Sequence, residues 1–195
     1  MNLRFTIIFL LSLFVIIFIF FFSQEIIKKL IPDHRFNINS TLNLVNHKNE
    51  KITKSNFVGN PSILFFGFTN CPDVCPTTLN DLSLLLDKLG EKGKNLKVYF
   101  VTLDPQRDTV DVLNDYIPYF GQQFIGVTGE EDKILNLVKN WGIYRKKNLT
   151  NKQDYLIDHT ASVFLINSEG QFAGTIAYQE KSDVALEKLE NLIRK

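Results

Sequence analysis

The sequence predicts an α/β domain of three layers that follows a single apolar helix. Strand-like and helix-like segments alternate along most of the chain, which is typical of a sheet covered by helices on both faces. One strand-like segment, 61–70, contains the apolar run ILFFGF, as expected for a central strand buried on both faces. A run without any charged residue, Phe5–Phe22, precedes these segments.

The composition fits one domain of ordinary size with an appendage. The chain has 195 residues, and its 22 Lys and Arg residues nearly balance its 21 Asp and Glu residues, which gives a net charge of +1. No block of basic residues stands out, so we expect no nucleic-acid partner.

The appendage is the apolar run near the N-terminus. In Phe5–Phe22 only Thr6 and Ser12 are polar. As a helix the run spans roughly 27 Å, close to the thickness of a hydrocarbon core, about 30 Å. A cleaved signal peptide has a shorter apolar region followed by small residues at the cleavage site, and neither feature is present here. We therefore predict an uncleaved transmembrane anchor at 5–23.

The anchor divides the chain into four predicted parts. These are a short N-terminal tail at 1–4, the anchor at 5–23, a linker at 24–37 and a folded domain at 38–195. The basic residues on the two sides of the anchor slightly favour a cytoplasmic domain. The chemistry of the cysteines, described below, favours the opposite side, and we predict that side.

The first elements of the domain can be placed from their patterns. Residues 41–53 alternate weakly and turn at Asn-His-Lys-Asn, so we predict a hairpin. The strand at 61–70 is followed by a helix at 76–93, in which five leucines recur at helical spacing. Pro76 suits the first turn of this helix, and Gly90 suits its end.

The remaining helices and strands can also be predicted, and their order along the chain indicates a fold. They are a strand at 96–104, a helix at 109–121 that Pro118 shortens, a strand at 124–129, a helix at 130–142, a hairpin at 161–178 that turns at Asn-Ser-Glu-Gly, and a helix at 181–195. A βαβ half followed by a ββα half is the order of a thioredoxin-like fold, which we predict here.

The two cysteines of the chain, Cys71 and Cys75, lie in the segment FGFTNCPDVCPTTL between the first central strand and its helix. Backbone N–H groups and the dipole at a helix N-terminus favour the thiolate form of cysteine. Thiolates serve both disulfide exchange and the binding of soft metal ions. A metal site, a redox disulfide and a structural crosslink are all open at this point.

A histidine provides a third group. His159 lies just before the strand that opens the C-terminal hairpin. In thioredoxin-like folds the turn that enters this strand faces the cysteine loop, usually with a cis-proline, and this chain has Asp-His-Thr-Ala there. Two thiolates and an imidazole suit Cu(I), or Zn(II) and Cu(II) with a fourth ligand. Asp158 could orient the imidazole or supply the fourth ligand.

Three segments of the sequence together resemble one known family. FGFTNCPDVCPTTL, VTLDPQRDT and DHTASVFLI are similar to the signature segments of the SCO/SenC copper-binding proteins of cytochrome oxidase assembly. The resemblance runs from about residue 36 to the C-terminus. It implies that Cys71, Cys75 and His159 are copper ligands, and that the partner is the subunit of cytochrome c oxidase that carries the CuA centre.

The segment DPQRDT allows two interpretations. Asp108 or Thr109 can cap the following helix, with Arg107 in a surface ion pair. Asp104 and Arg107 can instead contact a partner, because loops after the strands of an α/β sheet often carry function.

Two enzyme classes compete with a copper carrier. A membrane-tethered thiol–disulfide oxidoreductase would use the same fold, with Cys71 and Cys75 as its redox disulfide and the cysteines of the oxidase subunit as its substrate. Its usual Cys-x-x-Cys spacing and cis-proline are absent from this sequence. A peroxiredoxin would need a threonine where Pro72 stands.

We therefore expect a metallochaperone rather than an enzyme, with one copper ion per chain, and a monomer. No Arg- and Ser-rich transit segment precedes the anchor, so we predict the bacterial inner membrane with the domain in the periplasm. The alternative is the mitochondrial inner membrane, facing the intermembrane space.

Overall fold

The computed structural model describes residues 11–20, 22–23, 44–149 and 154–194. The chain divides into two units, Met1–His34 and Arg35–Lys195. In the first unit, residues 11–20 and 22–23 are helical. Over the described ranges, no helix has the length and apolar character needed to cross a membrane.

Several predicted boundaries fall outside the described residues. The tail at 1–4 and the linker at 24–37 lie wholly outside them, as do residues 5–10 and 21 of the predicted anchor. The predicted start of the domain at residue 38 does too. The anchor, the tail and the linker therefore stay predictions.

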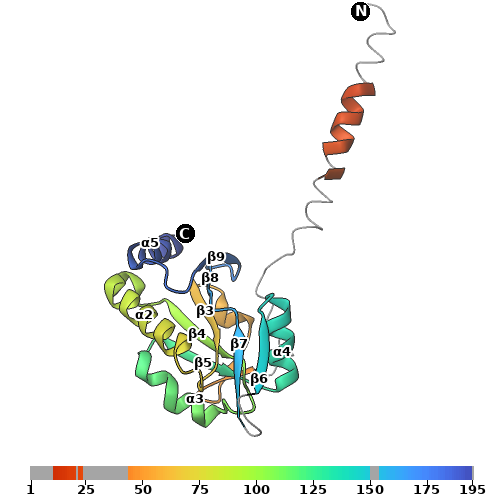
Figure 1. The fold of residues 1–195 in the computed structure, drawn as a ribbon. Coiled ribbons are helices and arrows are strands. Elements are labelled where there is room, and N and C mark those ends of the chain that lie inside the picture. The colour runs from red at the N-terminus through yellow and green to blue at the C-terminus, as the bar shows by residue number, and fades with distance from the viewer. Residues whose placement is uncertain (1–10, 21, 24–43, 150–153, 195) are drawn as a thin grey trace, which may run out of the picture. The chain divides into compact units, whose positions relative to one another are not determined.

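The second unit is built on a seven-stranded sheet (Figure 1). The strand order is β2-β1-β5-β4-β3-β8-β9, in which β3, β4 and β5 are parallel and the other neighbours are antiparallel. The strands are β1 (Leu44–Asn46), β2 (Lys51–Ile52), β3 (Ser62–Gly67), β4 (Lys97–Thr102), β5 (Phe124–Thr128), β8 (Val163–Ile166) and β9 (Phe172–Ile176). The predicted hairpins at 41–53 and 161–178 are confirmed as β1–β2 and β8–β9.

Helices cover both faces of this sheet, so the three-layer prediction is confirmed. The helices α2, α3 and α5 lie on one side, and α4 lies on the other (Figure 1). Both crossovers from β3 to β4 and from β4 to β5 proceed in one direction across the sheet, and right-handed crossovers then place α2 and α3 on the same face. The helices are α2 (Val74–Leu89), α3 (Val110–Tyr116), α4 (Glu131–Asn140) and α5 (Ser182–Arg194).

The helix boundaries follow local chemistry. Gly90 ends α2 at a positive φ of 53°, a conformation that glycine adopts without a steric cost. Thr109 caps α3, because its side chain accepts a hydrogen bond from the N–H of Val112. At the end of α3 the chain passes into a 3₁₀ turn, Ile117–Phe120, which contains Pro118, where the predicted helix was expected to shorten.

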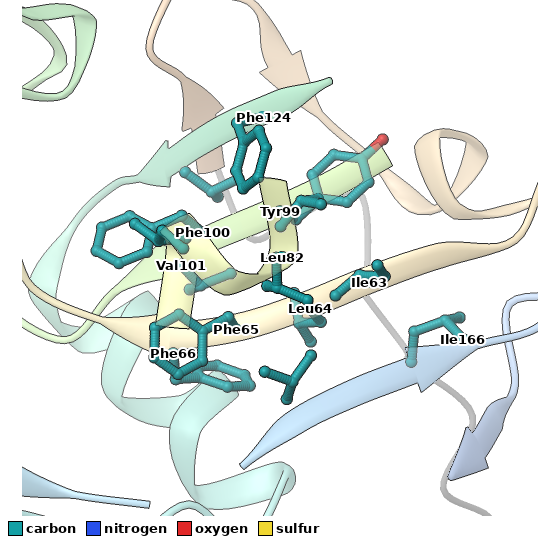
Figure 2. Packing of buried hydrophobic residues seen from close by; sticks show 14 of the residues in the cluster. Ile63, Leu64, Phe65, Phe66, Leu82, Tyr99, Phe100, Val101, Phe124 and Ile166 are labelled. Atoms are coloured by element: carbon teal, nitrogen blue, oxygen red, sulfur yellow. The ribbon is translucent and has the colours of Figure 1, made fainter. Parts of the chain in front are cut away.

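The core lies on both faces of β3. Every residue of this strand is buried, so its side chains pack into the layer of α2 and into the opposite layer alternately. Figure 2 shows Ile63, Leu64, Phe65 and Phe66 from β3 among side chains of β4, β5, β8 and α2. Burial of each such side chain contributes about 1.5–3 kcal/mol to folding, which fixes the strand whose end leads to the cysteines.

A second, two-stranded sheet was not predicted. It consists of β6 (Arg145–Leu149) and β7 (Tyr155–His159), which are antiparallel and are not hydrogen-bonded into the main sheet. His159 is therefore the last residue of a separate strand, and three residues separate it from β8.

Candidate metal centre

The two cysteines lie where the central strand turns into its helix. β3 ends at Gly67, and α2 begins at Val74, so Cys71 is in the connecting loop and Cys75 is the second residue of the helix. The backbone N–H of Cys75 donates a hydrogen bond to Sγ of Cys71, with 3.3 Å between the atoms. The predicted placement in the loop and the first helical turn is confirmed.

The two thiols have different environments. Cys75 is fully buried, whereas Cys71 is partly exposed, and both are free cysteines. A hydrogen bond with the Cys75 side chain lowers the pKa of Cys71 to about 4, with smaller contributions from His159 and from backbone N–H groups, against the effect of burial. The same interaction and burial raise the pKa of Cys75. Near neutral pH the pair therefore consists of a thiolate at Cys71 and a thiol at Cys75.

A glycine allows the buried sulfur to sit against the sheet. A Cβ atom at Gly67 would lie 2.6 Å from a ring carbon of Phe100 and 3.0 Å from Sγ of Cys75. These separations are too short for a side chain, so the close approach of Cys75 to the strand requires glycine.

His159 faces the sulfurs through one ring nitrogen. Its Nδ1 lies 2.8 Å from the carbonyl oxygen of Thr160. A carbonyl oxygen only accepts, so Nδ1 carries a hydrogen, and Nε2 is the ring nitrogen left to face the sulfurs. Nε2 lies 3.5 Å from Sγ of Cys75. The rings of Phe65 and Phe68 contact the imidazole edge to face, which limits its rotation.

These three side chains form a group that can hold a metal ion. One ligand atom from each of Cys71, Cys75 and His159 lies within 4.8 Å of the others. Two sulfurs and a neutral imidazole nitrogen form a donor set that suits Cu(I), and the lone pair on Nε2 is the one a metal requires. The three residues predicted from the sequence are thus brought together by the fold.

Asp158 lies differently from its neighbour. It is exposed on β7, and successive side chains of a strand point to opposite faces, so it points away from His159. Its register partner on β6 is Lys146. The described candidate ligand group does not include Asp158, and the carbonyl oxygen of Thr160 is the group that fixes the imidazole.

Asp104 and Arg107 are engaged inside the domain. Asp104 is fully buried, forms an ion pair with Arg107 and accepts a hydrogen bond of 2.6 Å from the Tyr155 hydroxyl. The Asp108 carboxylate is also buried and accepts from Thr69, which leaves Thr109 as the residue that caps α3. The hypothesis that Asp104 and Arg107 contact a partner stays a prediction.

Some residues of the site were missed in the sequence. The carbonyl of Thr160 carries no sequence signal, because any residue supplies one. Gly67 had a signal, since a glycine at the end of a buried strand marks a close approach of other groups. Tyr155 and Arg145 belong to the hairpin that was not predicted. Nε of Arg145 donates to the carbonyl oxygen of Leu103 at 2.8 Å.

The chain is similar in sequence to proteins of one known family. The SCO1/SenC family model matches residues 32–194. The mitochondrial SCO1 protein of Saccharomyces cerevisiae is 40% identical over 139 residues, which cover 69% of this chain and 47% of that protein. An SCO2-like protein of Rickettsia prowazekii is 33% identical over 144 residues, which cover 73% of this chain and 70% of that protein. The chain spans about half the length of the eukaryotic relatives it matches.

Solved structures give the same result for the fold. The copper-bound structure of ScoI from Bradyrhizobium japonicum has a TM-score of 0.71 at 30% identity, and covers 76% of this chain and 95% of that one. Copper-bound yeast Sco1 has a TM-score of 0.71 at 34% identity, and covers 78% of this chain and 86% of that one. By sequence and by fold, the chain belongs to the SCO1/SenC family.

Proposed function

We propose that this protein is a membrane-anchored copper metallochaperone that helps to assemble the CuA centre of cytochrome c oxidase. It binds one copper ion per chain through Cys71, Cys75 and His159, as a monomer, and passes the ion to the oxidase subunit that carries CuA. The anchor is the segment at 5–23, and the domain faces the periplasm of a bacterium. The alternative location is the intermembrane space of mitochondria.

One observation carries this proposal. Two sulfurs and one nitrogen of an imidazole lie within 4.8 Å of one another. Assembly of this group requires no large movement, because the three side chains already converge. A preassembled soft donor set supports tight binding of Cu(I).

The position of the site supports transfer to another protein. Cys71 and His159 are both partly exposed, so a second protein can bring its own ligands up to the ion. In such an exchange an incoming thiolate replaces one copper–sulfur bond at a time, and the metal is the cargo rather than a resident cofactor. The reduced state of both cysteines is required, since a disulfide offers no thiolate.

A second candidate function rests on the state of Cys71. This thiol is half-buried, its pKa is lowered to about 4, and the other thiol is adjacent. A low-pKa thiolate next to a second thiol is also the arrangement of a thiol–disulfide oxidoreductase. In this function Cys71 attacks a disulfide of the oxidase subunit, Cys75 displaces the reduced partner, and the two electrons of the dithiol pass to that partner. The product in this chain is a Cys71–Cys75 disulfide.

Substitution of the three ligands separates the two functions. The reduced protein, loaded anaerobically, should bind one copper ion, and Cys71→Ser or Cys75→Ser should abolish tight binding, because one thiolate and one imidazole leave Cu(I) short of soft ligands. His159→Ala should lower copper affinity at least about tenfold and keep most of the exchange with a small disulfide. Competition with a chelator and a thiol-exchange assay measure the two properties.

The second histidine in the described part of the chain supplies a matched control. His47 lies in the β1–β2 turn, where its Nδ1 accepts a hydrogen bond from the N–H of Gly126. His47→Ala should therefore leave copper binding unchanged. A His159→Ala protein that keeps its copper affinity while disulfide exchange collapses would overturn the copper proposal and favour the oxidoreductase.

A further inference from the structure

The ligands of the candidate metal centre come from two parts of the domain that are connected in different ways. Cys71 and Cys75 follow β3, which is buried in the middle of the main sheet. His159 ends β7, which belongs to the separate two-stranded sheet. No backbone ladder joins the described strands of this hairpin to the main sheet, so side chains must determine where the hairpin lies.

One side chain bonds both the hairpin and the body of the domain, in addition to the bond that Arg145 donates to Leu103. Nε of Arg107 is paired with the Asp104 carboxylate. Its Nη1 donates to Oδ1 of Asp154 at 3.0 Å, and its Nη2 donates to the carbonyl oxygen of Tyr155 at 3.1 Å. The guanidinium also stacks on the Tyr155 ring, with its central carbon 3.8 Å from the ring centre. Arg107 therefore holds Asp154, which precedes β7, and Tyr155, the first residue of β7.

Asp104 joins Arg107 and Tyr155 to the body of the domain. Its carboxylate is fully buried, accepts from Arg107, and accepts from the Tyr155 hydroxyl at 2.6 Å. A buried carboxylate with both oxygens engaged by charge-assisted or short hydrogen bonds resists displacement. Arg107 and Tyr155 are therefore fixed to each other both directly and through Asp104.

Asp108, the residue that follows Arg107, holds the segment that carries the two cysteines. Asp108 is buried, and its carboxylate accepts from the backbone N–H and the hydroxyl of Thr69, two residues before Cys71. The same carboxylate accepts from the hydroxyl of Thr102 at the end of β4. Adjacent residues of one loop thus tie the cysteine segment and the histidine hairpin to the same support.

We propose that Arg107 is a positioning residue, which holds the β6–β7 hairpin against the loop after β4 and thereby sets the place of His159 relative to the two sulfurs. The proposal deepens the proposed copper function and rests on it for the consequence in metal affinity. Arg107 touches none of the ligand atoms and acts through the hairpin. Its planar fork reaches Asp104, Asp154 and the backbone of Tyr155 at once, which a lysine ammonium cannot do with the same geometry.

The first test measures the hairpin without any metal. In the full-length protein, Arg107→Lys should speed amide hydrogen exchange in peptides from 144–149 and 154–160 about tenfold, because local opening of the hairpin becomes easier. Peptides from β3 and α2 should exchange at the wild-type rate. Tyr155→Phe removes only the hydroxyl that bonds Asp104, so it should change the same peptides in the same direction by a smaller factor.

The second test asks whether Arg107 acts through His159. Arg107→Lys should lower copper affinity about tenfold, the loss that follows removal of a group supporting a metal ligand. The Arg107→Lys, His159→Ala double variant should bind copper no more weakly than His159→Ala alone, because a displaced ligand cannot be lost twice. Additive losses of affinity would show that Arg107 acts elsewhere and would overturn the proposal.

A matched arginine provides the control. Arg194 pairs with Glu190 at 3.6 Å on the exposed face of α5, and Arg194→Lys should alter neither hairpin exchange nor copper affinity. Unchanged hairpin exchange in Arg107→Lys would refute the positioning role, whether or not the protein binds copper. Faster hairpin exchange in a protein that binds no copper would instead support the positioning role and refute the proposed function.

Discussion

At the scale of single residues, the site shows how two side chains of one type acquire different chemistry. Cys71 and Cys75 are four positions apart, yet one is partly exposed and receives a backbone hydrogen bond, and the other lies buried against Gly67. Their mutual hydrogen bond lowers the pKa of one and raises that of the other. The pair therefore titrates as a unit, and the exposed member is the nucleophile.

This difference predicts an unusual pH profile for alkylation. A thiolate reacts and a thiol does not, so the rate for Cys71 with iodoacetamide should stay nearly constant from about pH 6 to about pH 8 and fall only as pH approaches its pKa of about 4. The same protein unfolded in denaturant should react about tenfold faster for each unit of pH over that range. Peptide mass spectrometry identifies the residue modified first. A folded protein with the profile of the unfolded one would contradict the lowered pKa.

At the scale of elements, β3 determines both stability and the position of the site. Its side chains fill the two layers alternately, and its end leads directly to Cys71. Phe66 is buried against Phe164 and Trp141, on the opposite face from the neighbouring Phe65, whose ring contacts His159. The strand is thus held from both sides where the cysteine loop begins.

A large-to-small substitution in β3 should therefore be costly. Phe66→Ala should lower the free energy of unfolding by about 3–5 kcal/mol, because it removes a buried ring and leaves a cavity between two layers. Tyr119, which is 87% exposed, supplies an aromatic control, and Tyr119→Ala should change stability by less than about 0.5 kcal/mol. Urea unfolding followed by circular dichroism measures both. Equal losses in the two variants would argue against burial of β3 on both faces.

The elements also show which parts of the structure can be predicted from sequence. The main sheet and α2 follow from apolar runs and leucine spacing, since burial imposes those patterns. The place of His159 followed from the order of the elements, which brings the turn before β8 to the cysteine loop. The hairpin β6–β7 could not be predicted, because Arg-Lys-Lys-Asn-Leu has no apolar alternation. The position of this hairpin depends on Arg107 and Asp104, which are distant from it in the sequence.

A charged residue in a loop gives an equally weak signal. Asp104 follows a buried strand, and a carboxylate there is usually solvent-exposed, so contact with a partner was a reasonable expectation. Its burial becomes predictable only when the Tyr155 hydroxyl and the Arg107 guanidinium are known to face it. Such pairings join three separate segments, and no single segment has a sequence pattern that predicts them.

At the scale of the whole molecule, the proposed function depends on which compartment the domain occupies. A CuA centre lies on the non-cytoplasmic side of its membrane in the proposal, and the domain must lie there too. Positive charges on the domain side of the predicted anchor slightly favour the opposite orientation. The orientation is therefore a direct test of the proposal.

Protease added to intact spheroplasts of a bacterium that produces the full-length protein should cleave the domain. A cytoplasmic protein of the same cells should be protected until the membrane is broken, which serves as the control. The domain unit begins at about Arg35, so a fragment close to the length of the predicted anchor and linker should remain with the membrane. A domain protected until lysis would remove the CuA-bearing subunit as a partner.

The long separation between the ligands has a thermodynamic consequence. Cys75 and His159 are 84 residues apart in sequence, and they meet only when the sheet, the helix and the hairpin are all formed. The unfolded chain retains a close pair of thiols without a fixed imidazole, so any ion that uses all three ligands binds the folded state more tightly. By linkage, occupancy must raise the free energy of unfolding, and release must lower it. A carrier of this kind returns to its less stable form each time it completes a delivery.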